Sequence, residues 1–143
     1  TFRNLAHRLE PIRTVDGVEY INDSKATNVD SVYYALEAMD KPVVWIAGGT
    51  DKGNDYSAIE ALVKEKVKAL VCMGVDNTKL VEAFKGKVPV LVETNTIKDA
   101  IREAGQLAAD GDVVLLSPAC ASFDLFKNYM DRGDQFKAIV MSL

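Results

Sequence analysis

Apolar residues along this chain occur in short continuous runs, and most of these runs are followed by a segment with helical spacing. A run without polar alternation predicts a strand that is covered on both faces, as in a parallel sheet with helices on either side. The runs that predict such strands are Val43 to Ala47, Val67 to Met73, Val88 to Val92 and Asp112 to Leu116.

Helical spacing is clearest from Asn28 to Met39, where Val32, Ala35, Leu36 and Met39 share one face. The same kind of pattern recurs after each later strand. The further helices that it predicts are Tyr56 to Lys66, Asn77 to Phe84, Ile97 to Ala108, Phe123 to Met130 and Gln135 to Leu143.

The N-terminal part of the chain predicts a β-hairpin. Ile12 to Val15 and Val18 to Ile21 are β-type runs, and the dipeptide Asp16-Gly17 between them is favoured in two-residue hairpin turns. Strand–helix units behind a hairpin, joined by right-handed crossovers, predict a Rossmann-like doubly wound α/β domain with a mostly parallel sheet.

Size and composition agree with one globular domain over residues 1–143. Hydrophobic residues make up 48% of the chain and charged residues 27%, which excludes disordered and collagen-like classes. The formal charge is −4 without a basic stripe, so we expect no nucleic-acid partner, and the apolar runs are too short to cross a membrane. Because the chain begins at Thr1 rather than Met, we expect it to be part of a longer protein.

The cysteines and the histidine do not form a reactive motif. Cys72 and Cys120 each end an apolar run and are too far apart for a C-x-x-C motif, so we expect free, buried thiols in a reducing compartment. His7 is the only histidine, which excludes a metal cluster of several histidines and leaves Cys120 without an assigned catalytic base. We therefore predict no metal ion bound entirely by this domain.

Ligands of open parallel sheets bind at the carboxyl ends of the strands, so the loops that follow strands carry the candidate chemistry. In the first such loop, Asn22 to Asn28, Thr27 and Asp30 form a plausible capping pair for the next helix. Lys25 has no capping use there, because a helix N-terminus disfavours cations. A cation beside helix N–H groups instead indicates a site for phosphate or carboxylate.

Two further loops have unusual composition. The loop from Gly48 to Asp55 is rich in glycine, which permits close approach to a ligand, and its functional candidate is Lys52. We expect Asp55 simply to cap the next helix. The loop matches neither the P-loop nor the dinucleotide-binding glycine motif.

The third loop, Ser117 to Asp124, has small residues that leave space at the sheet edge. Ser122 could cap a helix that begins at Phe123, bind a carboxylate, or do both. We expect Phe123, Phe126 and Tyr129 to pack in the core rather than form a stacking platform. From the residues alone, the three loops indicate a small-anion or amino-acid site.

These segments also carry a family resemblance. His7-Arg8, the string DSKATN at residues 23–28, Gly48-Gly49 with Lys52, and the segment from Ser117 through Arg132-Gly133 closely resemble the C-terminal domain of the Mur ligases. Within that family, the resemblance is to the members that add D-glutamate, and it covers nearly the whole chain. It implies an ATP-dependent cytoplasmic enzyme of peptidoglycan synthesis.

In such an enzyme, ATP phosphorylates the terminal carboxylate of UDP-N-acetylmuramoyl-L-alanine. The amine of D-glutamate then attacks the acyl phosphate to form an amide. By resemblance, Thr27 and Lys52 would hold one carboxylate of D-glutamate, while Ser122 and the backbone near Phe123 and Tyr129 would hold the other. Tyr129 departs from the family, which often has Phe at this position, and the change is harmless if only the backbone contributes.

The resemblance also implies a nucleotide-facing group. Asp23 would lie near the ribose of ATP, and Arg8 and Lys25 near its phosphates. The 143 residues contain no P-loop, so ATP and Mg²⁺ would be held mainly by a central domain, beside an N-terminal domain for the UDP-linked substrate. We therefore predict that this chain alone neither hydrolyses ATP nor forms the amide.

Other interpretations remain open at the level of the sequence. The chain could be a free-standing small-anion or amino-acid-binding module with a regulatory role, or a Mur ligase domain for another amino acid. A nucleotide-binding Rossmann domain is disfavoured, because no glycine fingerprint follows the first strand.

Overall fold

The predicted hairpin opens the computed structural model, which describes residues 6–143. Strands β1 (Glu10–Val15) and β2 (Val18–Asn22) pair antiparallel. Asp16 and Gly17 between them have φ values of 51° and 77°, the left-handed conformation that a two-residue turn of this kind requires.

Within the described residues, β1 and β2 belong to a six-stranded sheet with the strand order β1-β2-β6-β3-β4-β5. All neighbouring strands except β1 and β2 are parallel, which confirms the prediction of a mostly parallel sheet. Three of the four strands predicted from apolar runs begin within one residue of their predicted starts, and β5 starts two residues later than its apolar run. The central strands are β3 (Val43–Ala47), β4 (Val67–Met73) and β6 (Val113–Leu116), while β5 (Val90–Thr94) lies at the edge of the described sheet.

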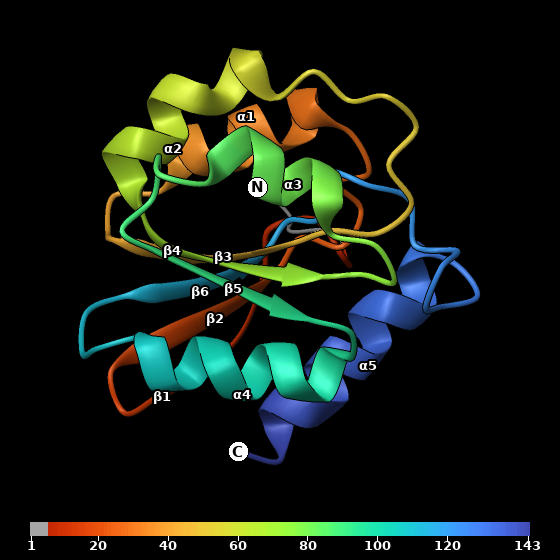
Figure 1. Cartoon of the computed structure of the whole chain (residues 1–143). Helices are drawn as coiled ribbons and strands as arrows, with labels where there is room; N and C mark the ends of the chain where they lie inside the picture. The colour runs from red at the N-terminus through yellow and green to blue at the C-terminus, as the bar shows by residue number, and fades with distance from the viewer. Residues whose placement is uncertain (1–5) are drawn as a thin grey trace, which may run out of the picture.

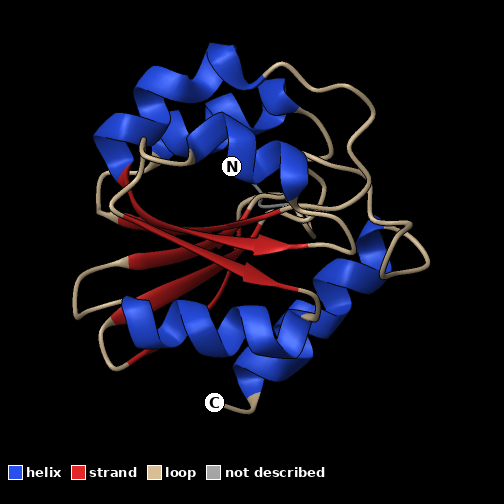
Figure 2. Ribbon diagram, viewed as in Figure 1, coloured by secondary structure: helices blue, strands red, loops and turns tan. Residues whose placement is uncertain are grey.

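Helices cover both faces of this sheet, as the doubly wound prediction requires (Figures 1 and 2). One face carries α1 (Val29–Ala38), the 3₁₀ turn η1 (Tyr56–Ile59) that continues into α2 (Glu60–Lys66), and α3 (Thr78–Phe84). The other face carries α4 (Ile97–Leu107) and α5 (Tyr129–Met141).

Each face of the sheet has its own hydrophobic core. On the α1 side, Trp45 is fully buried and meets the ring of Phe84 nearly edge-on, with 5.4 Å between ring centroids. On the α4 side, Phe136 of α5 belongs to a second core, formed by the strand side chains that point to that face, among them Ile46 and Leu116. These two cores explain why the central strands read as continuous apolar runs rather than as alternating ones.

One predicted helix is wrong. The segment Phe123 to Met130 is not a helix: residues 122–128 form turns and bends, and α5 begins at Tyr129 and continues past Gln135 without a break. Asn128 caps it by accepting a hydrogen bond from the backbone N–H of Asp131 (2.8 Å). Phe123 is 67% exposed, so the core role predicted for it is wrong as well, whereas Phe126 is partly buried against the α4-side core.

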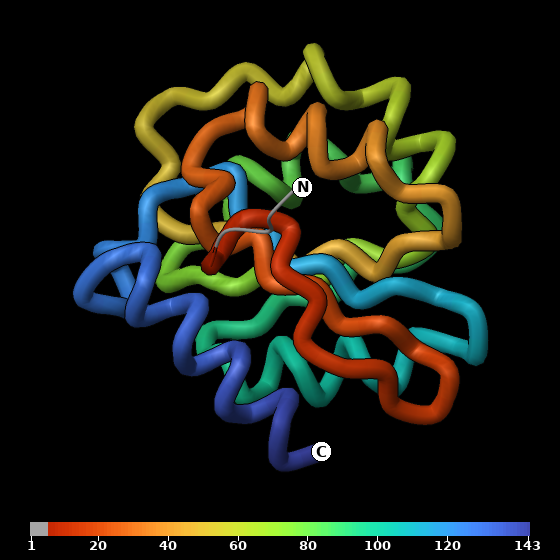
Figure 3. Tube along the Cα trace, turned by 180° about the vertical axis from the view of Figure 1, so that it is seen from behind, coloured from red at the N-terminus to blue at the C-terminus, as the bar shows by residue number. Residues whose placement is uncertain are grey.

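The strand order makes the carboxyl end of β6 the expected place for a ligand. This edge of the sheet is the side formed by the carboxyl ends of β2, β6 and β3. The chain leaves β2 and β3 toward the α1 face, but it leaves β6, which lies between them, toward the α5 face. The loops after these three strands therefore diverge at one edge of the sheet, as ligand-binding α/β sheets require. Figures 1 and 3 show the three loops at this same edge from opposite sides.

Candidate functional site

Backbone hydrogen bonds join the three candidate loops to one another. The N–H of Ala119 donates to the carbonyl of Ala26 (2.9 Å), which connects the loop after β6 to the loop after β2. The N–H of Gly48 donates to Pro118 (3.0 Å), and the N–H of Thr50 donates to Ala121 (2.9 Å), which connects the loop after β3. The loop after β6 is therefore the common support of the other two.

Arg132 of α5 also joins the loop after β2 to the loop after β6, a contact region that we call the loop junction. Its side chain is 1% exposed, and within residues 6–143 its guanidinium donates to Ser24 Oγ (2.9 Å), the Ser24 carbonyl (2.7 Å) and the Cys120 carbonyl (3.1 Å). Ser24 Oγ in turn donates to the carbonyl of Tyr129 (2.6 Å). Burial lowers the pKa of Arg132 to about 10, so the group stays positively charged at neutral pH.

A second network holds the turn that carries Lys52. Asp51 Oδ1 accepts hydrogen bonds from the N–H groups of Gly53 and Asn54 (2.9 Å each), and Asp51 Oδ2 accepts from the Tyr56 hydroxyl (2.7 Å). The Asn54 side-chain amide donates to the carbonyl of Ala119 (2.9 Å). This network attaches the exposed Lys52 turn to the loop that carries Ser122.

The protonation states within this network follow from burial and hydrogen bonding. Burial raises the pKa of the Tyr56 hydroxyl, so it remains a donor at neutral pH. Burial alone would raise the pKa of Asp51, but the hydrogen bonds from Asn54, Tyr56 and Gly53 outweigh it and lower that pKa. Asp51 is therefore an ionised acceptor that keeps the turn in one conformation.

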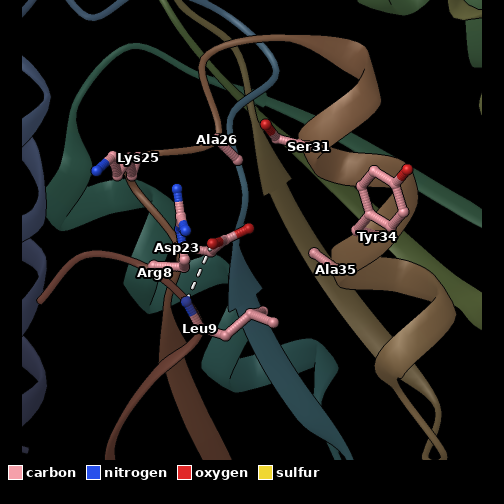
Figure 4. A pocket seen from close by; sticks show the side chains of 8 residues that line it. All are labelled: Arg8, Leu9, Asp23, Lys25, Ala26, Ser31, Tyr34 and Ala35. Carbon is pink, nitrogen blue, oxygen red and sulfur yellow. Dashed lines mark hydrogen bonds between the residues drawn. The ribbon is translucent and has the colours of Figure 1, made fainter. Parts of the chain in front are cut away.

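Arg8, Asp23 and Lys25, the residues expected to face ATP, all line one cavity of about 330 Å³ (Figure 4). The side chain of Lys25 points away from Asp23 in this view. The remaining lining residues are mostly apolar or small: Leu9, Ala26, Ser31, Tyr34 and Ala35.

Asp23 is only 4% exposed, and two hydrogen bonds hold its carboxylate in place in this cavity. Its Oδ1 accepts from the N–H of Leu9 (3.0 Å), and its Oδ2 accepts from the hydroxyl of Ser117 (2.8 Å). Burial raises the pKa of Asp23 from 3.8 to about 6, while these hydrogen bonds and nearby Arg8 act in the opposite direction. At neutral pH the group is therefore mostly a fixed carboxylate.

The residues expected to bind D-glutamate lie on the three joined loops and at the start of α5, outside that cavity. Of the described residues that line the cavity, none belongs to this group, which comprises Thr27, Lys52, Ser122, Phe123 and Tyr129. Thr27 and Lys52 are exposed, Phe123 is exposed and Ser122 is buried. Tyr129 is the first residue of α5, a position whose N–H has no partner within its own helix.

The capping role predicted for Thr27 is wrong. The N-cap of α1 is Asn28, whose Oδ1 accepts from the N–H of Ser31 (2.9 Å). Of the alternatives left open for Ser122, a helix cap is excluded, because no helix begins at Phe123. The predicted cap at Asp55 is confirmed, since its side chain accepts from the N–H of Ser57 (3.0 Å).

Sequence reasoning missed the residues that connect the loops. In the sequence, Arg132 stands out only as part of the segment that resembles the family, and the motifs that mark the three loops give no role to Asp51, Asn54 or Tyr56. The local spacing of Asp51, Gly53 and Asn54 could have indicated an Asx turn. The contacts of Arg132 carry no local signal, because Ser24 lies 108 positions away along the chain.

Cysteine, metal and membrane features complete the description. Cys72 and Cys120 are buried free thiols as predicted, and burial raises the pKa of both, that of Cys72 to about 12. Across residues 6–143, no group of three His, Cys, Asp or Glu side chains is placed to hold a metal ion. Over the same range, the helices are all too short or too polar to cross a membrane.

Comparison with known protein families identifies the family of this chain. The family described as "Mur ligase, glutamate ligase domain" matches residues 7–120. The chain belongs to this Mur ligase family. Its match includes the cavity-lining loop, the Lys52 turn and the loop after β6 as far as Cys120.

Curated Mur ligases resemble this chain over its whole length. The UDP-N-acetylmuramoylalanine–D-glutamate ligase of Cytophaga hutchinsonii is 59% identical over 143 residues, which are 100% of this chain and 32% of the relative. The enzyme of the same name from Salinibacter ruber is 50% identical over 142 residues, 99% of this chain and 31% of the relative. The chain thus spans about a third of the length of these relatives.

Solved structures share the fold of this Mur ligase domain. The UDP-N-acetylmuramate-alanine ligase of Thermotoga maritima has a TM-score of 0.65 at 14% identity, covering 99% of this chain and 31% of that one. A bifunctional folylpolyglutamate synthase/dihydrofolate synthase of Yersinia pestis, complexed with AMPPNP and a Mn ion, has a TM-score of 0.67 at 17% identity, covering 96% and 32%. At such identities the likeness supports the fold alone.

Proposed function

We propose that this chain is the amino-acid-binding, C-terminal domain of a three-domain ligase that joins D-glutamate to UDP-N-acetylmuramoyl-L-alanine at the expense of ATP. The observation that carries the proposal is the identity of 59% across the whole chain with a ligase of that name. The reducing environment suited to the free thiols Cys72 and Cys120 supports a cytoplasmic location.

In the proposed site, D-glutamate lies at the edge where the three loops meet. Lys52 and Thr27 bind one carboxylate, and Ser122 with backbone N–H groups near Phe123 and Tyr129 binds the other. A charge-assisted hydrogen bond from Lys52 is roughly twice as strong as a neutral one. Holding both carboxylates directs the amine toward the acyl phosphate, and such positioning can lower a barrier by about 7–11 kcal/mol.

The loop contacts support this arrangement. The Asn54–Ala119 hydrogen bond attaches the Lys52 turn to the Ser122 loop. The Asp51–Tyr56 hydrogen bond holds the turn itself, so the two ends of the proposed dicarboxylate site share one support. The charge of Arg132, buried beneath the same loops, favours an anion at this edge.

ATP occupies the neighbouring cavity in this proposal. The fixed carboxylate of Asp23 accepts hydrogen bonds from ribose hydroxyls, and Arg8 and Lys25 lie toward the phosphates. Mg²⁺ supplies charge neutralisation during phosphoryl transfer when it is bound. Since the described residues contain no group of three His, Cys, Asp or Glu side chains that could hold a metal ion, the proposal assigns Mg²⁺ to the central domain.

The proposal is tested by steady-state kinetics of the full-length protein that carries this chain. We expect Lys52→Ala and Ser122→Ala each to raise the KM for D-glutamate by roughly ten- to a hundredfold, the effect of losing one hydrogen bond to a charged group. The KM for ATP should change little. Lys64→Ala, on the exposed surface of α2, is the matched control.

Two outcomes would contradict the proposal. Unchanged D-glutamate kinetics in both variants would remove Lys52 and Ser122 from the site. Activity of the wild-type protein with L-alanine or diaminopimelate, but not with D-glutamate, would assign the domain to another amino acid.

A further inference from the structure

The wall of the Asp23 cavity that is formed by α1 has no role in the function proposed above. Tyr34 projects from this helix and is 69% exposed, while Ala35 beside it is buried. Both line the cavity (Figure 4). The ring of Tyr33 lies perpendicular to that of Tyr34, at an interplanar angle of 85° and with 5.8 Å between centroids. An aromatic ring is therefore available at the mouth of a charged pocket.

Three kinds of chemistry meet in this one cavity. Asp23 offers a fixed carboxylate that suits the hydroxyl groups of a sugar, and Arg8 and Lys25 offer cations that suit phosphate. On the α1 side, Leu9, Ala35 and the ring of Tyr34 offer apolar and aromatic contacts, and the Leu9 side chain extends toward α1 (Figure 4). A nucleotide is a ligand class that needs all three together.

The size of the cavity limits which part of a nucleotide it holds. Its volume of about 330 Å³ is near the lower end of the range for small-molecule sites, roughly 300–1,000 Å³. That space suits a nucleoside better than a whole nucleoside triphosphate. The phosphates would then extend past Arg8 and Lys25, out of this domain.

We infer that the base of the bound nucleotide stacks against Tyr34, in the apolar part of the cavity between α1 and Leu9. Every base has a flat π-face, so one aromatic side chain is sufficient to hold it without base-specific hydrogen bonds. Asp23 fixes the ribose and thereby sets the distance between base and phosphates. This inference rests on the proposed function, because it takes ATP as the ligand of this cavity.

The test compares Tyr34→Ala, Tyr34→Phe and Glu37→Ala in the full-length protein. We expect Tyr34→Ala to raise the KM for ATP by about tenfold, within the range known for loss of one base–aromatic contact, with little change in the KM for D-glutamate. Tyr34→Phe keeps the ring and should retain near-normal KM values. Glu37→Ala is the matched control on the same helix, since Glu37 is exposed and does not line the cavity.

Other outcomes would overturn the inference. An unchanged KM for ATP in an active Tyr34→Ala protein would show that the base lies elsewhere. Parallel changes in kcat and in both KM values would instead place Tyr34 against a neighbouring domain. If the wild-type protein formed no ADP in response to D-glutamate, the proposed function would fail. Equilibrium dialysis with ATP and the same variants would then still decide whether Tyr34 contacts the nucleotide.

Discussion

Burial gives Asp23 and Arg132 their distinct properties. Arg132 is enclosed with neutral oxygens as its hydrogen-bond acceptors, so it adds positive charge to the loop junction without a carboxylate directly bonded to it in the described chain. Asp23 is enclosed with two donors, a backbone N–H and a hydroxyl. Both groups lose solvation on folding, and burial accordingly shifts the pKa of each toward its neutral form.

The raised pKa of Asp23 predicts a pH-dependent stability. Since this pKa is about 6 in the folded chain against 3.8 as the reference, the folded chain binds the proton more tightly. The proton-linked contribution to stability is fully present below pH 3.8 and is lost as the pH rises through 6. We expect Asp23→Asn to gain stability relative to the wild type by about 2 kcal/mol between about pH 4 and about pH 7.5.

Urea unfolding of both proteins at the two pH values measures this difference. Asparagine keeps an oxygen that can accept from the Leu9 N–H. Any stability lost through a changed hydrogen bond is the same at both pH values, so it cancels when the two stability differences are compared. Asp40→Asn, in the exposed connection between α1 and β3, is the matched control. A difference between Asp23→Asn and wild type that does not vary with pH would contradict the burial argument.

Among the helices and strands, α5 has its position relative to β2 fixed by the close approach of one residue, Gly133. Gly133 lies in the interior of this helix, where alanine would ordinarily be favoured by roughly 0.5–1 kcal/mol. A Cβ at this position, however, would overlap the imidazole of His7 and lie 3.0 Å from Asn22 Nδ2. His7 Nδ1 and Asn22 Nδ2 are themselves 3.0 Å apart in a hydrogen bond, so neither can move without losing a contact.

We therefore expect Gly133→Ala to destabilise the fold, against helix propensity. The close approach of α5 to the end of β2 makes overpacking the dominant effect, about 1–3 kcal/mol. Gln135→Ala, at an exposed position of the same helix, should change the free energy of unfolding by less than about 0.5 kcal/mol. Chemical denaturation measures both, and a Gly133→Ala protein as stable as wild type would show that α5 can shift away from β2.

The sequence predicts those elements well whose apolar pattern follows from burial alone. The central strands and the helices before residue 123 lie close to their predicted bounds. A continuous apolar run indicates a strand that is buried on both faces, and a periodic one indicates a helix that is buried on one face. The segment from Phe123 to Met130 has a similar apolar spacing, but residues 123–128 are not helical and only Tyr129 and Met130 belong to α5. Its chain must cross from the edge of β6 to the opposite face of the sheet, and the cap at Asn128 determines where α5 begins.

At the scale of the whole molecule, the chain holds binding groups but lacks part of the chemistry of the proposed reaction. In the proposed ligase, the P-loop that holds ATP for acyl-phosphate formation belongs to the central domain, and the 143 residues contain no such motif. We expect the purified 143-residue chain to release no phosphate from ATP with or without D-glutamate. The full-length protein should form ADP in response to D-glutamate and UDP-N-acetylmuramoyl-L-alanine.

A coupled assay for ADP, run on both proteins in parallel, measures this difference. The full-length protein with Lys52→Ala provides a control in which all domains are present but the amino-acid site is weakened. D-glutamate-dependent phosphate release by the 143-residue chain alone would contradict the prediction.

Local composition and periodicity are sufficient to predict the hairpin, the strand–helix order, the mostly parallel sheet and the loops that carry Lys25, Lys52 and Ser122. Each of these features can be recognised within one segment of the chain. Two other features appear only in the folded chain: Arg132 joins the first and third loops, and Tyr34 reaches the Asp23 cavity. Such contacts depend on β6 lying between β2 and β3, which brings together residues about a hundred positions apart, and no local pattern records that strand order.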